Sequence, residues 1–364
     1  MNEVFDFLDL LSIKKLSETK LYLLLEKYKS PGNIKAADRN ELISLVGSEI
    51  AHHIKNISSN HKQHKNFREL IEKLRIKVIP YYSKEYPVWL KQISHFPPVI
   101  FVRGEILKED EVSVAIIGTR GATVYGKEIA RDFAGRFVDC GVTVVSGMAR
   151  GIDTQAHWGA LKNGGRTIAV LGCGVDICYP PENRKLMEEI IKNGAVISEF
   201  TLNTPPLAQN FPKRNRIISG LARAVVAIEA KERSGVMNTV RWALDQNKEV
   251  FAIPGNIYAR TSKGTNLLIK EGAIPVTSAD EVLEYLGIQH TKAERQAKEV
   301  LLDEKERLVW DELSFEPIYL DILSERLNQS TGTILEVLLG LEMKGLIRQL
   351  PGMMFVKNFD TQGR

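Results

Sequence analysis

The side chains best suited to bind a ligand in this chain form a cationic run within residues 211–220, whose sequence is FPKRNRIISG. Lys213, Arg214 and Arg216 lie close together in this run, and no acidic residue occurs between positions 199 and 229. These cations therefore need counter-charge from a distant part of the fold or from an anionic ligand. A solvated basic surface is the alternative interpretation of such a cluster.

The composition is that of an ordinary globular protein with two or three domains. The chain has 364 residues, 44% of them hydrophobic and 26% charged, and a net charge of +4. This mild positive charge permits a polyanionic partner without requiring one. The three cysteines form no C-x-x-C pair, which argues against a disulfide framework or a zinc site and indicates a reducing compartment. No signal peptide or long apolar run is present, so we expect a cytoplasmic protein without membrane contact.

Strand and helix patterns alternate along residues 77–288. Apolar, β-branched runs fall at 99–102, 112–117, 142–145, 167–171, 195–197, 224–228 and 250–253. Helical patterns separate most of them, for example at 126–138 and 181–193. Alternation of this kind predicts an α/β fold with an extended Rossmann-like parallel sheet that is covered on both faces. Ligands of such sheets bind at the carboxyl ends of the strands.

Glycines and polar residues are concentrated at those strand ends. Gly118, Thr119 and Arg120 follow one predicted strand, and Gly147 and Arg150 follow the next. Further loops of this type are Gly172–Gly174, the cationic run, Ser234–Gly235 and Pro254–Gly255. Backbone N–H groups at helix starts carry partial positive charge, and glycine allows a phosphate to approach closely. The pattern predicts an anion-binding rim along one edge of the sheet.

Two classes of enzyme are alternatives to a protein that only binds its ligand. The segment Gly121–Lys127 satisfies the G-x-x-x-x-G-K pattern of a nucleoside triphosphatase, but Glu128 stands where Ser or Thr should hold magnesium. A nucleotide-cleaving enzyme resembling phosphoribohydrolases would use the segment Ser234–Thr239 with acid–base groups from Asp153, Glu199 or Glu229. We favour the simpler alternative, in which Asp153 caps a helix and both glutamates pair with the cationic run. We therefore expect no catalytic residue, no cofactor and no metal.

Two smaller units flank the sheet. Residues 1–76 have helical patterns that fit a helix-hairpin-helix or SAM-like domain, although the hairpin lacks the usual glycines. His52, His53, His61 and His64 match no zinc-ligand spacing, and their polar surroundings indicate a solvated linker. Residues 289–302 form a charged linker, and residues 303–364 fit a winged helix with helices at 304–313, 319–327 and 331–343. The third helix offers Thr333, Glu336 and Glu342 where a duplex reader would carry Arg, Lys, Asn or Gln, which favours a structural or protein-docking role.

The ordered motifs resemble the DNA processing protein A family (DprA, also called Smf). The resemblance runs through residues 77–288. Its motifs are Gly118-Thr-Arg120, Ser146-Gly-Met-Ala-Arg-Gly-Ile-Asp153, Gly172-Cys-Gly-Val-Asp176 with Tyr179-Pro180, Ser198-Glu199, Phe211–Gly220, Ser234-Gly235, Pro254-Gly255 and Gly264-Thr-Asn266. The C-terminal unit is similar to the winged helix that only some members carry.

The resemblance implies a protein that binds single-stranded DNA without sequence preference. Members of the family protect incoming strands during natural transformation, help to load the RecA recombinase, and work as homodimers without an established cofactor or catalytic residue. Arg120 and Lys213 match the family's DNA-contacting cations. Its rim is matched by Gly147, Arg150, Arg214, Asn215 and Arg216, and Gly118 and Thr119 belong to the same motifs. The residue types agree, because single-strand binding needs cations for the backbone and aromatic rings such as Phe211 or Tyr179 for the bases.

Overall fold

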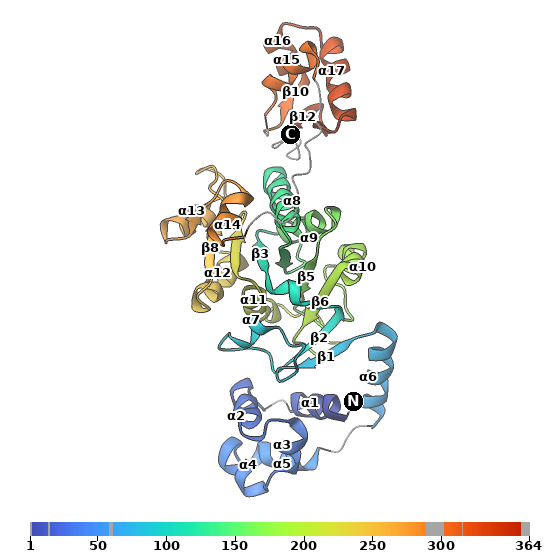
Figure 1. Cartoon of the computed structure of the whole chain (residues 1–364), viewed down its shortest axis with the longest axis vertical. Helices are drawn as coiled ribbons and strands as arrows, with labels where there is room; N and C mark the ends of the chain where they lie inside the picture. The colour runs from blue at the N-terminus through green and yellow to red at the C-terminus, as the bar shows by residue number, and fades with distance from the viewer. Residues whose placement is uncertain (1, 14, 58–60, 289–301, 315, 358–364) are drawn as a thin grey trace.

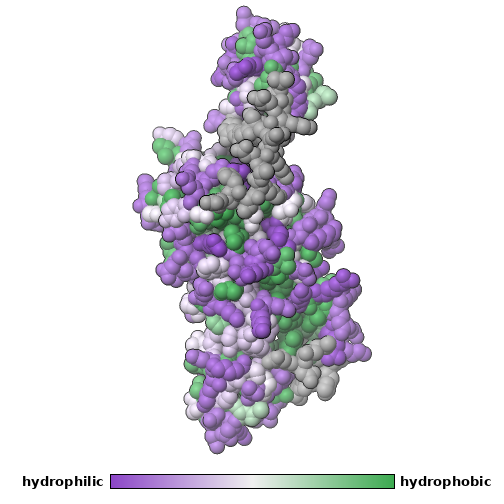
Figure 2. Space-filling view, viewed as in Figure 1, coloured by the Kyte–Doolittle hydropathy of each residue, from purple (hydrophilic) through white to green (hydrophobic). Residues whose placement is uncertain are grey.

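The computed structural model describes residues 2–13, 15–57, 61–288, 302–314 and 316–357. It has N-terminal helices, a central α/β unit and a C-terminal winged helix, arranged in this order along the long axis of the molecule (Figure 1). The face seen in Figure 2 is largely hydrophilic over the two terminal units, and hydrophobic residues show mainly over the central unit. No helix among the described residues is long and apolar enough to cross a bilayer.

The described residues of the N-terminal part form six helices: α1 (Asn2–Ser12), α2 (Glu18–Tyr28), α3 (Pro31–Ala36), α4 (Arg39–Val46), α5 (Ser48–Asn56) and α6 (His61–Leu74). Ser17, Ser30 and Asp38 cap α2, α3 and α4 by accepting hydrogen bonds from backbone N–H groups of the first turn. The linker interpretation of the histidines is wrong. The first two lie exposed on α5 and the last two fall at the start of α6, because buried apolar residues at Ile50 and Ile54 give α5 an amphipathic pattern.

A nine-stranded sheet forms the centre of the molecule, in the order β1-β2-β6-β5-β4-β3-β7-β8-β9. Its strands are β1 (Lys77–Pro80), β2 (Val99–Gly104), β3 (Ser113–Ile117), β4 (Thr143–Ser146), β5 (Thr167–Val170), β6 (Gly194–Ser198), β7 (Ala224–Ala227), β8 (Glu249–Ala252) and β9 (Ile274–Pro275). All seven predicted strands are present. The sheet is parallel except at one edge, where β1 pairs antiparallel with β2 and β2 antiparallel with β6.

Helices cover both faces of this sheet, as the strand pattern predicts. One face of β3 contributes Val114 and Ile116 to a buried cluster with α8 (Val124–Asp139), α9 (Ile152–Lys162) and α14 (Ala279–Tyr285). The other face contributes Ala115 and Ile117 to a cluster with the remaining core helices. These are α7 (Val88–Lys91), α11 (Asn210–Leu221), α12 (Gly235–Asp245) and α13 (Lys263–Lys270), while α10 (Arg184–Asn193) packs in a third cluster together with the N-terminal helices.

The C-terminal unit is the predicted winged helix. It consists of α15 (Glu304–Glu312), α16 (Leu320–Leu327) and α17 (Thr331–Met343) beside a small sheet of β10 (Ile318–Tyr319), β12 (Met354–Lys357) and β11 (Ile347–Leu350). Arg348 of β11 donates to Glu128 of α8 at 2.8 Å, which joins this unit to the core. The exposed side chains of α17 include Glu336, Leu339 and Met343, and none of these is a cation.

Close packing between neighbouring strands gives a test of the fold. A Cβ atom at Gly194 would overlap the carbonyl oxygen of Thr167 on β5. We expect Gly194→Ala to lower the free energy of unfolding by about 1–3 kcal/mol in a denaturant titration, because the backbones of β5 and β6 must separate. Gly121→Ala is the matched control, since nothing lies near its added methyl group. Equal stability of both variants would contradict the β5–β6 register.

Candidate nucleic-acid interface

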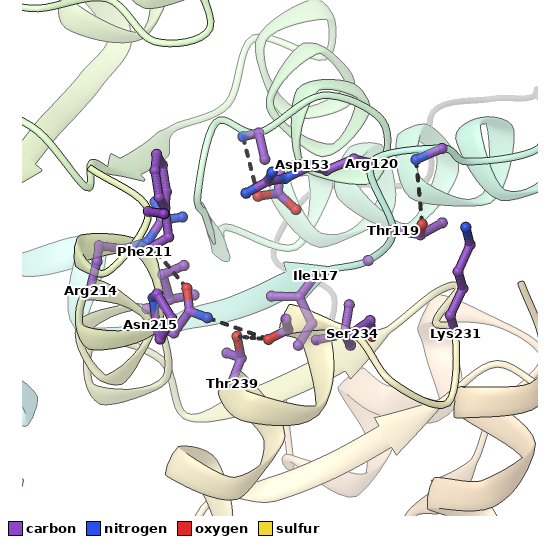
Figure 3. Close-up of a pocket in the computed structure, with 18 of the residues that line it drawn as sticks. Ile117, Thr119, Arg120, Asp153, Phe211, Arg214, Asn215, Lys231, Ser234 and Thr239 are labelled. Carbon is purple, nitrogen blue, oxygen red and sulfur yellow. Dashed lines mark hydrogen bonds between the residues drawn. The ribbon is translucent and has the colours of Figure 1, made fainter. Parts of the chain in front are cut away.

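A cavity of about 590 Å³ opens at the carboxyl ends of β3, β4 and β7. One wall is the loop Gly118–Gly121, which follows β3, and another is the first two turns of α11 with Phe211, Arg214 and Asn215. The loop between β7 and α12 closes the opposite side with Lys231 and Ser234 (Figure 3). The predicted rim residues that come together in this lining are Gly118, Thr119, Arg120, Phe211, Arg214 and Asn215. Gly147 and Arg150 line a smaller adjoining hollow with Arg120 and Phe211.

Phe211 is the aromatic centre of this site. The guanidinium carbon of Arg120 lies 5.5 Å from the centroid of its ring, and that of Arg214 lies 6.0 Å away. The ring of Tyr179 lies 5.5 Å from it, centroid to centroid. Phe211 is half-buried and borders both hollows, so it is not a core residue. A partly exposed ring between two cations is a suitable surface for stacking a base.

Arg214 is buried and holds the start of α11 against the sheet. Its side chain is only 4% exposed. Nη1 donates to the carbonyl oxygen of Gly147 at 2.9 Å and also to that of Val170. Burial lowers the pKa of Arg214 to about 10, although the nearby Asp153 carboxylate raises it. Burial likewise raises the pKa of Asp153 to about 6, against the opposing effect of the Arg214 charge.

Gly147 is a glycine because this buried pair leaves no room for a side chain. A Cβ atom there would lie 2.6 Å from Nη2 of Arg214 and 2.8 Å from Oδ2 of Asp153. A larger residue at this position would therefore displace Arg214 as well as obstruct a phosphate. Gly118 has a similar constraint, because a Cβ atom would overlap the side chain of Ile152.

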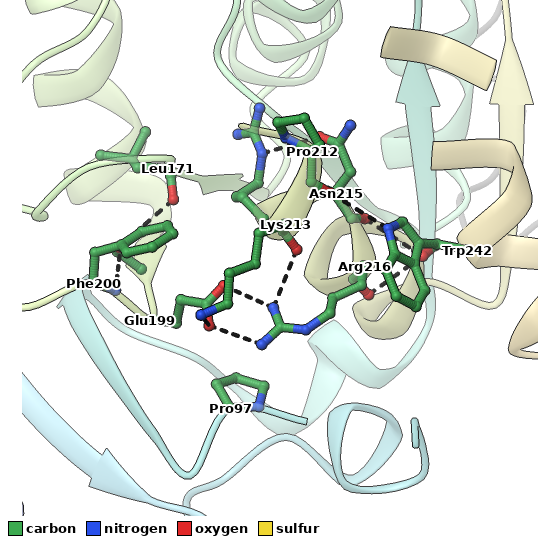
Figure 4. A network of polar contacts seen from close by, with 12 residues as sticks. Pro97, Leu171, Glu199, Phe200, Pro212, Lys213, Asn215, Arg216 and Trp242 are labelled. Carbon is green, nitrogen blue, oxygen red and sulfur yellow. Dashed lines mark hydrogen bonds and ion pairs between the residues drawn. The ribbon is translucent and has the colours of Figure 1, made fainter. Parts of the chain in front are cut away.

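Arg216 is buried in an ion pair and does not reach the cavity. It is 2% exposed, and its two terminal nitrogens donate to the two carboxylate oxygens of Glu199 at 2.7 and 2.8 Å (Figure 4). Lys213 lies beside the same carboxylate, with Nζ 3.4 Å from Oε2, and its side chain is 39% exposed. Glu199 thus supplies the counter-charge that the cationic run requires, as the sequence predicted for this glutamate.

Glu229 has a different role from the predicted one. Its carboxylate accepts hydrogen bonds from the backbone nitrogen of Thr123 at 2.9 Å and from its hydroxyl at 2.6 Å, and not from the cationic run. A Cβ atom at Gly126 would overlap this carboxylate. The start of α8 is therefore already occupied by an anion, where a triphosphate would have to bind. Glu128 pairs with Arg131 and Arg348, so its position also departs from that of a magnesium-binding hydroxyl.

The exposed cations of the site are Arg120, Arg150 and Lys231. Arg150 pairs with Glu182, which offsets part of its charge. Lys231 was missed by the sequence analysis, although its place just beyond a predicted strand was the available signal. Asn215 donates to the side-chain oxygen of Asn238 at 3.2 Å and so connects α11 to α12.

The structure does not bring together the carboxylates that hydrolysis would need. Asp153 lines the cavity, whereas Glu199 and Glu229 are engaged with Arg216 and Thr123. Glycosidic cleavage commonly uses two carboxyl groups that flank the bond. Across the described residues, no group of three His, Cys, Asp or Glu side chains is placed to hold a metal ion.

The comparison with known families decides the classification. The family model described as DNA recombination-mediator protein A matches residues 77–287. The chain belongs to this family. A model of the DprA winged helix domain matches residues 292–353. Protein Smf of Escherichia coli is 40% identical over 287 residues, which cover 76% of each chain. The DNA processing protein DprA of Bacillus subtilis is 39% identical, over 60% of this chain and 74% of its own.

Solved structures of the family have the same fold. DprA from Streptococcus pneumoniae aligns with a TM-score of 0.69 at 32% identity, over 77% of this chain and 97% of its own. The DprA of Helicobacter pylori, a structure reported for its single-stranded DNA binding mode, aligns with a TM-score of 0.53 at 29% identity. That alignment covers 58% of this chain and 96% of the other.

The burial of Arg216 gives a test of its role. We expect Arg216→Met to lower the free energy of unfolding by on the order of 3 kcal/mol, because Glu199 is left buried with only the longer contact to Lys213 among the described side chains. Arg120→Ala should change stability by less than about 0.5 kcal/mol, since the residue is exposed. Denaturant unfolding measures both. Recovery of stability in the double variant Arg216→Met/Glu199→Leu would support the ion-pair explanation, and an undiminished single variant would contradict it.

Proposed function

We propose that this protein binds single-stranded DNA along the rim formed by Arg120, Phe211, Lys213 and Lys231. The observation that carries the proposal is the half-buried ring of Phe211 below the exposed guanidinium of Arg120. This arrangement offers a stacking surface for a base and a cation for the adjoining phosphate. The single-stranded DNA binding mode described for the Helicobacter pylori relative supports it.

The rim residues have two kinds of role in this proposal. Arg120, Phe211, Lys213 and Lys231 contact the strand, with Tyr179 as a second ring beside Phe211. Arg150 and Lys213 add weaker contacts, because Glu182 and Glu199 already pair with them. The remaining predicted residues position these groups through backbone geometry, hydrogen bonds and ion pairs. They are Gly118, Thr119, Gly147, Arg214, Asn215 and Arg216.

Family membership supports a place for this binding in DNA processing and transformation. We infer that the protein protects incoming or processed single strands and helps to load the RecA recombinase on them, as a homodimer in the cytoplasm without catalytic activity. Light scattering of the purified protein tests the dimer. RecA filament formation on strands covered by a single-strand binding protein, with and without this chain, tests the loading.

The winged helix favours a protein contact over duplex recognition. The exposed face of α17 carries Glu336 and two apolar residues, Leu339 and Met343, and Arg348 of the adjoining sheet is engaged with the core. A negatively charged side chain on this face would be repelled by DNA phosphates.

The nucleotide-cleaving alternative would need Asp153 to act as the acid–base group. Its raised pKa of about 6 and its place in the cavity are the features in favour of that activity. Incubation with nucleoside monophosphates and chromatography for free base tests this alternative. Release of base that Asp153→Asn abolishes would establish an enzyme, and its absence together with tight single-strand binding would support the binding protein.

Salt dependence distinguishes a rim that follows the DNA backbone from a pocket for a small phosphate. We expect labelled oligo-dT to bind more tightly than the matched duplex in fluorescence anisotropy. Log affinity should fall with log salt by ~0.7 for each phosphate contact. Weak binding of both nucleic acids would contradict the proposal.

The cations of the rim should carry this dependence. We expect Arg120→Ala and Lys213→Ala each to weaken oligo-dT binding and to reduce the salt slope by ~0.7, similarly across base sequences. Phe211→Leu should cost about 1–3 kcal/mol of affinity for each stacked base while the slope stays the same. Lys162→Gln is the matched control, because it is exposed at the end of α9, away from the cavity. Unchanged affinity in both cation variants would show that the rim does not bind the strand.

A further inference from the structure

A second cationic cluster surrounds Trp89 at the amino ends of the strands, on the side of the sheet opposite to the rim. The ammonium nitrogen of Lys248 lies 4.6 Å from the centroid of the Trp89 ring, and the guanidinium carbon of Arg223 lies 5.9 Å from it. Trp89 Nε1 and Arg223 Nε both donate to the carbonyl oxygen of Glu111, at 2.9 and 3.3 Å. All three side chains are half-buried. One ring thus holds two cations in place.

These cations have no acidic partner among the residues that the structure describes. Both contact the Trp89 ring, Arg223 also donates to the Glu111 carbonyl, and neither forms an ion pair with a carboxylate in the described part of the chain. Burial lowers the pKa of Lys248, and the charge of Arg223 lowers it further. Two like charges beside one ring repel each other in a poorly solvated place, and an anion between them would relieve that repulsion.

Helix α11, most of which is buried, spans the distance between the rim and this cluster. Its first turn carries Phe211 and Lys213 at the carboxyl ends of the strands, and its last residue lies just before Arg223, whose backbone nitrogen donates to Ser113 at the amino end of β3. A twelve-residue helix spans roughly 18 Å. Trp242 lies along the way: its Nε1 donates to the carbonyl oxygen of Pro212 at 3.3 Å, and the ring of His95 lies 6.3 Å from its own.

We propose that Arg223 and Lys248, held by Trp89, form a second backbone contact for the single strand that the rim binds. The ligand class is the phosphodiester of a strand long enough to extend from the rim past Trp242 and His95 to the Trp89 cluster. This inference rests on the proposed function, because it extends the same strand. The rim binds the first few nucleotides, and the Trp89 cluster is reached only by longer strands.

Strand length provides the test. The variant Arg223→Gln/Lys248→Gln keeps a donor for the Glu111 carbonyl but removes both charges. We expect its affinity for a ~20-nucleotide oligo-dT to fall about ten- to thirtyfold near 0.1 M salt, with a salt slope smaller by ~1.4, as the loss of two phosphate contacts requires. Its affinity for a ~6-nucleotide oligo-dT, near the short end of known site sizes, should equal that of the wild type.

The controls separate this inference from the proposed function. Lys73→Gln/Lys162→Gln removes two exposed charges from α6 and α9 and should leave both affinities unchanged. If the wild type binds neither oligonucleotide, the proposed function itself fails. If the wild type binds both and the Arg223→Gln/Lys248→Gln variant binds the longer strand equally well, the second contact alone is overturned.

Lysine labelling gives a measurement on the unmodified chain. An acylating reagent with mass spectrometric readout should modify Lys248 in the free protein. We expect both oligonucleotides to protect Lys213, and only the longer one to protect Lys248. Equal labelling of Lys248 with and without the longer strand would overturn the inference, whatever the variant's folding.

Discussion

The structure of the binding edge depends on the burial of two arginines of α11. Arg214 donates to carbonyl oxygens at the ends of β4 and β5, and Arg216 is held by both oxygens of Glu199. Buried charges are stable only when they are paired and hydrogen-bonded, so these contacts fix the helix in one position over the sheet. That position places Phe211 beside Arg120 from a loop 91 positions earlier in the chain.

Because of this burial, cations that look alike in the sequence have different roles. The buried arginines set the geometry, and in the proposed function the exposed Arg120 and Lys231, with the half-exposed Lys213, provide charge to the strand. Glu229 occupies the start of α8, so the larger cavity is where we propose that the strand binds. The same division extends to the far edge of the sheet, where Trp89 holds two cations without a carboxylate among the described residues.

Much of the fold could be predicted because its signals are local. The apolar runs gave the seven core strands, and capping residues and glycines gave the helix ends, including Gly47 after α4. The short edge strands β1 and β9 were not predicted, because two to four residues carry little periodicity. The histidine-containing helices were mistaken for a linker, because polar composition masked the amphipathic pattern of α5.

The candidate site was predicted by residue but not by role. Motif positions brought Arg120, Phe211 and Arg214 to one cavity, as the rule for parallel sheets requires. Which arginine of the run is buried depends on long-range partners such as Glu199 and Gly147, and spacing along the chain does not reveal them. The Trp89 cluster joins residues from three separate segments, so no local sequence pattern could predict it.

The most direct test of the account is to map where a single strand lies. An oligo-dT of ~20 nucleotides carrying photoreactive thymine analogues would be irradiated with the protein, and the cross-linked peptides identified by mass spectrometry. We expect cross-links at Phe211 and Tyr179, lost in competition with unlabelled oligo-dT and absent with duplex. Cross-links confined to the winged helix or the N-terminal helices would contradict it.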